Sequence, residues 1–192
     1  MTKGFSAAAV TAALAAGLVD IGENYAGELL SKSAVISAQE RGGPRARWHY
    51  LGTIQRRKVR ELVPVVDCWQ TVSRLSEAEA ILRHGGSKCV MVEVDTTGLP
   101  GRNGCSASET GELVGALGEV GLEVSGLMVM GPGGPSELSR EAFRTTARLA
   151  AELGLAELSM GMSDDLEVAV EEGATIVRVG RALFGERSRP EW

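Results

Sequence analysis

The segment from Leu158 to Gly185 has the residue types and spacing of a phosphate-binding site. A strand pattern ends in the small-residue turn Ser159–Ser163, a helix pattern closes at Gly173, and a β-branched strand pattern leads into another short helix pattern. Small residues that expose backbone N–H groups at helix starts bind phosphate groups. In parallel barrels, the loops after the last two strands and a short extra helix form the usual phosphate site. We therefore predict that this segment, named here the phosphate cup, holds a phosphorylated ligand.

The size and charge of the chain limit the classes of function. Its 192 residues, with 44% hydrophobic and 23% charged residues, are typical of a soluble globular protein, and we expect one domain over residues 1–192. The net charge of −5 argues against a nucleic-acid partner. No apolar run reaches the roughly 18 to 20 residues that span a bilayer. The Ala-rich stretch Ser6–Ala16 lacks a convincing cleavage context for a signal peptide. We therefore expect a cytoplasmic protein with no membrane partner.

The cysteines and histidines do not form a pattern that binds metal. The three cysteines are odd in number and have no C-x-x-C spacing, which argues against a disulfide framework or a zinc site. His49 and His84 are too few and too scattered for a typical metal site. We interpret His49, which lies in a strand pattern, as a hydrogen-bonded core histidine, and we predict no metal site.

Helix and strand patterns alternate along the whole chain, which is typical of a parallel sheet covered by helices. About seven strands are predicted, beginning near Leu18, Trp48, Val63, Cys89, Leu122, Leu158 and Thr175. The third is expected over Val63–Trp69. A (β/α)₈ barrel has eight strands, and here a helix pattern starts directly after Phe5. We therefore predict an α/β fold, a TIM-type barrel incomplete at its N-terminus, with unpaired edges beside the absent first strand.

Five motifs, spaced over nearly the whole chain, resemble the pyridoxal 5′-phosphate (PLP) homeostasis proteins, which are single-domain relatives of the alanine racemase barrel. They are Gly22-Glu23-Asn24-Tyr25, Trp48-His49-Tyr50-Leu51-Gly52, Gly126-Leu127-Met128, the run Leu158–Asp165 (LSMGMSDD) and Val177-Arg178-Val179-Gly180. The LSMGMSDD run is highly specific. The resemblance implies a TIM-type barrel that carries PLP without a known catalytic reaction and buffers cellular vitamin B6.

The resemblance also implies which lysine holds the cofactor. Family members bind PLP as a Schiff base on a lysine at the end of the first strand, and Lys3 of Thr2-Lys3 stands at the matching position. A lysine must be neutral to attack an aldehyde, which requires desolvation or a neighbouring cation. The competing interpretation of Lys3 is a frayed terminal lysine in water.

The remaining site residues follow from the same resemblance. Arg178 matches the arginine that faces the pyridine nitrogen, and Asn24 would lie at the barrel mouth near the ring. Because arginine keeps its proton, the ring nitrogen would stay unprotonated, which suits a carrier better than a transaminase. Four residues would contact the phosphate: Ser159, Met160 through its backbone, Gly180 and Arg181. The family commonly has threonine at the position of Arg181, and arginine could pair with the phosphate or point away.

Other interpretations remain open at this stage. A racemase or decarboxylase of this barrel type would need a second domain and usually a dimer partner, whereas we expect a monomer with transient contacts to PLP enzymes. Another phosphate-binding barrel enzyme is a further alternative, because a fold alone does not determine function. The chain could also be a truncated relative unable to bind PLP. The absent first strand is explained either by a start site placed too late or by a genuine truncation.

Overall fold

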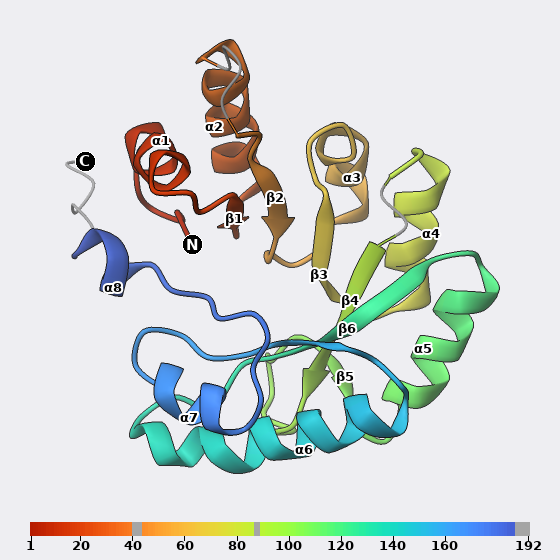
Figure 1. The fold of residues 1–192 in the computed structure, drawn as a ribbon. Coiled ribbons are helices and arrows are strands. Elements are labelled where there is room, and N and C mark those ends of the chain that lie inside the picture. The colour runs from red at the N-terminus through yellow and green to blue at the C-terminus, as the bar shows by residue number, and fades with distance from the viewer. Residues whose placement is uncertain (40–43, 87–88, 187–192) are drawn as a thin grey trace.

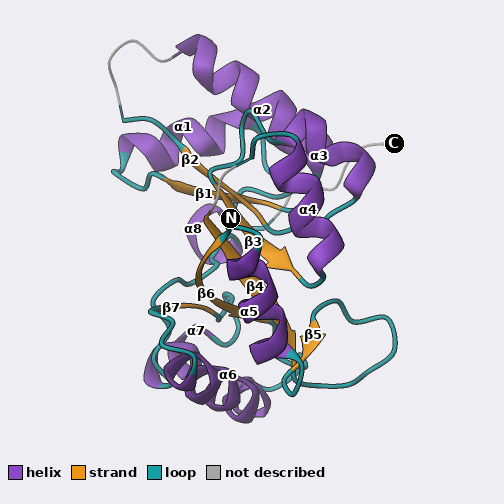
Figure 2. Cartoon of the chain, turned by 90° about the vertical axis from the view of Figure 1, so that its right-hand side faces the viewer, coloured by secondary structure: helices purple, strands orange, loops and turns teal. Residues whose placement is uncertain are grey.

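Parallel strands form a curved sheet with helices on its outer side in the computed structural model, which describes residues 1–39, 44–86 and 89–186 (Figures 1 and 2). Residues 187–192 of the predicted domain lie outside the described part. The strands are β1 (Asp20–Glu23), β2 (Arg47–Tyr50), β3 (Cys68–Val72), β4 (Cys89–Asp95), β5 (Cys105–Ser106), β6 (Glu123–Val129) and β7 (Glu157–Ser159). Their order is β1-β2-β3-β4-β6-β7, with β5 paired to β4. The predicted α/β barrel, incomplete at its N-terminus, is confirmed.

The helices surround this sheet and cover its outer face (Figure 1). They are α1 (Ala7–Ala15), α2 (Ala26–Gln39), α3 (Arg56–Leu62), α4 (Leu75–Arg83), α5 (Thr110–Glu119), the 3₁₀ helix η1 (Ser136–Ser139), α6 (Arg140–Glu152), α7 (Leu166–Glu171) and α8 (Arg181–Phe184). Their apolar faces bury residues such as Leu29, Leu62, Ile81 and Phe143 against the strands. Each such side chain contributes roughly 1.5–3 kcal/mol to stability.

The third and last predicted strands differ from the structure. The third strand was predicted over Val63–Trp69, but β3 begins only at Cys68. The preceding valines instead end α3: Val63 N–H bonds to Val59 O, and Val66 N–H bonds to Leu62 O. These apolar residues pack against the core from a helix end, so a run of valines resembles a strand without being one.

The strand expected at Thr175 is reduced to a single bridge between Ser159 and Ile176. The amides of Thr175 and Ile176 both donate to Leu158 O, which breaks the regular ladder. The short strand β5, by contrast, was not among the predicted strands and follows a Gly-rich segment.

The N-terminal residues close part of the gap between the two edges of the sheet. Thr2 N–H donates to Gly22 O in β1 at 3.0 Å, and the Met1 ammonium donates to Val179 O at 2.7 Å. Met1 and Thr2 therefore lie between β1 and the segment that follows β7. The unpaired edges predicted beside the absent first strand are covered at this level of the barrel.

Within the described residues, no helix is both long and apolar enough to cross a lipid bilayer.

Candidate functional site

The two loops of the phosphate cup lie side by side, at the carboxyl ends of the strands. Arg178 N–H donates to Gly161 O at 2.9 Å, and Ala182 N–H donates to the hydroxyl of Ser163 at 3.3 Å. The guanidinium of Arg181 forms an ion pair with Asp164. These contacts join the loop after β7 to the first turn of α8, as a shared phosphate site requires.

The backbone at the start of α8 keeps donors available for a ligand. Among the described residues, neither Gly180 N–H nor Arg181 N–H donates a hydrogen bond, because both stand at the start of a helix. The Arg181 side chain is turned towards Asp164, so its amide is the group that stays without a partner among the described residues.

Ser159 and Met160, at the start of the phosphate cup, have their polar groups engaged inside the barrel. The hydroxyl of the fully buried Ser159 donates to Gln70 Oε1 at 2.7 Å inside the barrel. The amide of Met160 donates to Ile176 O at 3.1 Å, and its side chain is buried. The hydroxyl of Ser159 and the amide of Met160 are therefore engaged within the barrel, and their contact with a phosphate stays a prediction. Ser163, which was not selected from the sequence, lies beside the start of α8, and its place just before the acidic start of α7 was the available signal.

Lys3 lies next to α8. Met1, two residues before Lys3, donates a hydrogen bond to Val179 O. The ring centroid of Phe5, two residues after Lys3, lies 5.2 Å from that of Phe184. Lys3 is therefore held beside the first turn of α8. Its Nζ atom stands 5.3 Å from the centroid of the exposed Tyr25 ring, a cation–π contact that keeps the amine at the barrel mouth.

A buried ion-pair network fixes the backbone around Lys3. Lys32 Nζ donates to Thr2 O at 2.7 Å, to Glu23 Oε1 at 2.6 Å and to Glu28 Oε2 at 2.7 Å. Thr2 Oγ1 donates to Glu23 Oε1 at 2.6 Å, and Gly4 N–H donates to Glu28 Oε2 at 2.9 Å. The residues on both sides of Lys3 are therefore anchored to α2 and β1, and Lys3 is not part of a frayed terminus.

Burial dominates the electrostatics of this network. It raises the pKa of Glu23, while the ammonium of Lys32 and the hydroxyl of Thr2 act in the opposite direction. Removing Lys32 would leave the Glu23 carboxylate buried without a cation.

Asn24 lies at the end of β1, at the same level as Lys3. Its carbonyl oxygen is so close to Gly52 that a Cβ atom added there would stand 1.9 Å away, which explains a glycine after β2. The backbone just after β1 therefore passes close to the backbone just after β2.

Arg178 is a buried cation that points into the barrel and is held by neutral acceptors. Nη1 donates to Ser159 O at 2.6 Å and Nη2 to Val129 O at 2.9 Å. Among the described residues, its Nε–H has no hydrogen-bond acceptor and no carboxylate forms an ion pair with it. Desolvation lowers the pKa of Arg178 to about 10, opposed by the charges of Asp165 and Glu93.

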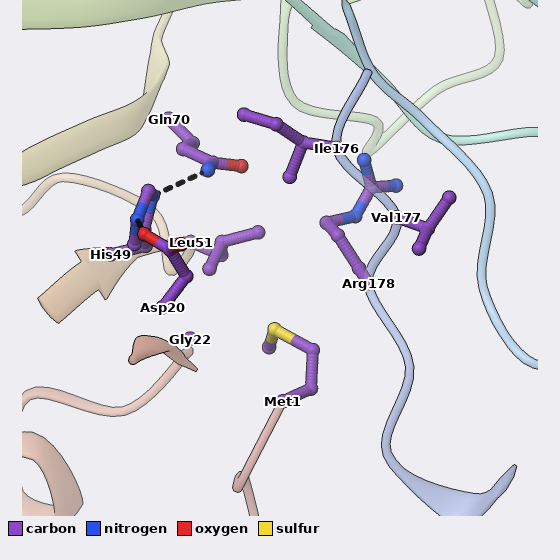
Figure 3. Close-up of a pocket in the computed structure, with 9 residues that line it drawn as sticks. All are labelled: Met1, Asp20, Gly22, His49, Leu51, Gln70, Ile176, Val177 and Arg178. Carbon is purple, nitrogen blue, oxygen red and sulfur yellow. Dashed lines mark hydrogen bonds and ion pairs between the residues drawn. The ribbon is translucent and has the colours of Figure 1, made fainter. Parts of the chain in front are cut away.

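A small cavity lies beside Arg178, with a volume of about 50 Å³ (Figure 3). Its lining residues come from the N-terminus, three neighbouring strands and the segment after β7: Met1, Asp20, Gly22, His49, Leu51, Gln70, Ile176, Val177 and Arg178. The cavity therefore lies beside the segment after β7, where the sheet ladder is reduced to a single bridge.

Comparison with known proteins agrees with this geometry. The family model of the alanine racemase N-terminal domain matches residues 1–188. A pyridoxal phosphate homeostasis protein of Pseudomonas aeruginosa is 37% identical, over 97% of this chain and 83% of the relative. The chain belongs to the pyridoxal phosphate homeostasis protein family. A relative of the same name from Deinococcus radiodurans is 36% identical, over 96% of this chain and 86% of its own length.

Solved structures of this family and of more distant proteins share the fold. PipY of Synechococcus elongatus with PLP bound has a TM-score of 0.84 and 34% identity, with 96% of this chain and 90% of that chain covered. An alanine racemase of Clostridium difficile has a TM-score of 0.75 at 14% identity and covers 98% of this chain and 52% of that one. The racemase likeness concerns the fold alone.

Two buried polar groups of this family member were not selected from the sequence. Glu93, in the apolar strand β4, accepts a hydrogen bond from Asn103 Nδ2 at 2.8 Å, and burial raises its pKa to about 7. Gln70, in the fully buried strand β3, donates to His49 Nδ1 at 2.7 Å. His49 is the hydrogen-bonded core histidine that was predicted. A polar residue between buried neighbours on a strand was the signal for both Glu93 and Gln70.

Proposed function

We propose that this chain binds PLP at the carboxyl end of the barrel and takes part in intracellular PLP homeostasis without catalysing a reaction of its own. The observation that carries the proposal is the position of Lys3, held between Met1 and Phe5 against the start of α8. The backbone around Lys3 is thus held near α8, whose first amides have no acceptor among the described residues, and its amine lies at the barrel mouth over Tyr25. An aldehyde with a phosphate arm requires an amine and phosphate-binding amides in this combination. The PLP-bound PipY relative supports the same cofactor.

The phosphate of PLP would be held by the amides of Gly180 and Arg181 and by the hydroxyl of Ser163. Ser163 already accepts a hydrogen bond from Ala182 N–H, so it stands at the edge of the same helix turn. In this proposal, Ser159 and Met160 support the cup from below, because their polar groups are engaged inside the barrel.

Lys3 and Arg178 would hold the rest of the cofactor. PLP supplies an aldehyde that condenses with a lysine amine, and Lys3 is the lysine that we assign to it. Arg178 would present its unpaired Nε–H to the pyridine nitrogen, and Asn24 would flank the ring at the mouth. Arginine does not give up its proton, so the ring nitrogen stays unprotonated and the ring is a weak electron sink. This arrangement suits a carrier better than a transaminase.

The remaining expectations form part of the same proposal. We propose that the protein is a cytoplasmic monomer that makes transient contacts with PLP enzymes. The formal net charge of −5 argues against nucleic acid as its partner.

A borohydride experiment tests the proposal. The sequence contains four lysines, Lys3, Lys32, Lys58 and Lys88, so peptide mapping after reduction with PLP assigns the label unambiguously. We expect the label on Lys3, its loss in Lys3→Arg, and its retention in the matched control Lys58→Arg. Label spread over the other lysines would overturn the assignment. Racemisation or decarboxylation of amino acids by the loaded protein would overturn the non-catalytic role.

A further inference from the structure

Arg178 is connected to the opposite end of the barrel by a continuous line of hydrogen bonds. Its Nη1 donates to Ser159 Oγ at 3.1 Å, and Ser159 Oγ donates to Gln70 Oε1 at 2.7 Å. Gln70 Nε2 donates to His49 Nδ1 at 2.7 Å, and His49 Nε2 lies 2.9 Å from Asp20 Oδ1 (Figure 3). Five side chains, from β1, β2, β3, β7 and the segment before α8, thus form one connected path.

The hydrogen bonds of this path all run in the same direction. The guanidinium at one end can only donate, and the Asp20 carboxylate at the other end can only accept. Every intermediate group then accepts from the Arg178 side and donates towards Asp20, which gives His49 the neutral Nε2–H tautomer. Arg47 Nε also lies 3.3 Å from His49 Nε2, but Asp20 Oδ1 is closer to Arg47 Nε, at 2.7 Å, and serves as its acceptor. Aligned dipoles between a cation and an anion strengthen one another in a low-dielectric interior.

Because the path is buried, the donor and acceptor of each hydrogen bond along it cannot be exchanged without a cost in free energy. Ser159, Gln70 and His49 are almost fully buried, so a reversed or broken link would leave a donor or acceptor without a partner. Arg178 lacks an ion pair within the described residues, so neutral acceptors hold its guanidinium in place: the carbonyl oxygens of Ser159 and Val129 and the hydroxyl of Ser159.

We propose that Asp20, His49, Gln70 and Ser159 form a positioning relay that orients Arg178 towards the ring nitrogen of PLP and thereby sets the affinity for the cofactor. This inference rests on the proposed function, since it assigns the groups that act behind Arg178. None of the four touches the cofactor in this scheme; each acts through the next.

Protonation of His49 would oppose the relay. A proton on Nδ1 would face the amide N–H of Gln70, and the amide would have to turn, which removes the acceptor of the Ser159 hydroxyl. Burial lowers the pKa of His49, against the effect of Asp20. The charged groups that face this ring are Asp20 on β1, Arg47 on β2 and Glu157 on β7, of which Arg47 Nε also pairs with Asp20 at 2.7 Å.

A double-mutant cycle on PLP affinity tests the relay. We expect Gln70→Met and Ser159→Ala each to weaken binding about 3- to 15-fold, the effect of one lost internal hydrogen bond. Because both act along one path, the double variant should bind within about twofold of the weaker single variant. Thr71→Val is the matched control: Thr71 is buried, follows Gln70, faces the other side of β3 and donates to Gly52 O at 2.7 Å.

Two further readouts separate positioning from general destabilisation. Gln70→Glu keeps an acceptor for Ser159 but removes the N–H that donates to His49 Nδ1, so it should recover only part of the affinity lost in Gln70→Met. The affinity of the wild-type protein should fall at acidic pH as His49 becomes protonated, and this fall should be absent in Gln70→Met. Thermal melts of the cofactor-free variants identify any that do not fold.

The outcomes distinguish the relay from the proposed function. If the wild-type protein shows no PLP label on Lys3, the proposed function is overturned. If Lys3 is labelled but Gln70→Met and Ser159→Ala bind PLP as Thr71→Val does, the relay is overturned. Multiplicative losses in the double variant would also contradict it.

Discussion

The ammonium nitrogen of Met1 donates a hydrogen bond to the carbonyl oxygen of Val179 at 2.7 Å. This contact joins segments 178 residues apart and brings the start of the chain to the last turn of the barrel. Burial lowers the pKa of the Met1 ammonium, with the nearby carboxylate of Glu23 acting in the opposite direction. The lysine two residues later is thereby kept beside the phosphate cup.

Lys32→Met should weaken both the fold and the attachment of PLP. The substitution leaves the Glu23 carboxylate buried without a cation and releases Thr2 O, so we expect a loss of about 3–5 kcal/mol in the free energy of unfolding. The yield of borohydride label on Lys3 should fall in parallel. Urea denaturation and peptide mapping measure the two effects. Lys58→Met, on α3, is the matched control, and an equal effect there would contradict the anchoring role.

Ser163→Ala should weaken binding of PLP but not of pyridoxal, which lacks the phosphate. The loss of one hydroxyl bonded to a charged group predicts roughly a 10- to 100-fold lower affinity for PLP. Equilibrium titration of both compounds measures the difference. Equal losses for PLP and pyridoxal would show that Ser163 supports the loop instead of contacting the phosphate.

Glu93 should make stability depend on pH near neutrality. Its pKa is raised to about 7, so the folded state keeps the proton that the unfolded chain releases at lower pH. The stabilisation is present below the ordinary glutamate pKa of about 4.3 and is lost as the pH rises to about 7. Between pH 4.5 and 8, wild-type stability should fall by on the order of 2–3 kcal/mol more than that of Glu93→Gln. Urea denaturation across this range tests it, and parallel pH profiles would contradict it.

Gly126→Ala should destabilise the sheet strongly. A Cβ atom at Gly126 in β6 would stand 2.0 Å from Glu157 O, a backbone atom of β7 that cannot move without separating the strands. We expect a loss of about 2–3 kcal/mol or more. Gly115→Ala is the control, because Gly115 lies within α5 with no atom near the added methyl group, and it should gain roughly 0.5–1 kcal/mol. Thermal or urea denaturation compares the two.

Local sequence patterns predicted the fold where the periodicity of apolar residues and the turn residues determine the backbone conformation. The alternation of helical and strand periodicity indicates a parallel sheet, and the small-residue turns after the last strands indicate a phosphate site. They failed at Val63–Val66, where apolar residues at the end of a helix have the sequence pattern of a buried strand. They also failed at Thr175, where the expected strand is reduced to a single bridge. In both places, tertiary packing decided the backbone hydrogen bonds.

The sequence by itself indicated the family and the cofactor class, because LSMGMSDD and VRVG are contiguous motifs. The candidate lysine followed from the family resemblance, since Thr2-Lys3 stands at the position of the lysine that binds PLP in the family. Only the tertiary structure decided which groups in those motifs face the cup. Ser159 and Ser163 are both serines of the same motif, and the sequence does not distinguish their roles. In the structure, the hydroxyl of Ser159 donates to Gln70 inside the barrel, whereas the hydroxyl of Ser163 accepts a hydrogen bond from the start of α8. The relay from Arg178 to Asp20 was also beyond the sequence. Its members lie on four segments far apart in the chain, and only the closure of the sheet brings their hydrogen-bonding atoms within reach.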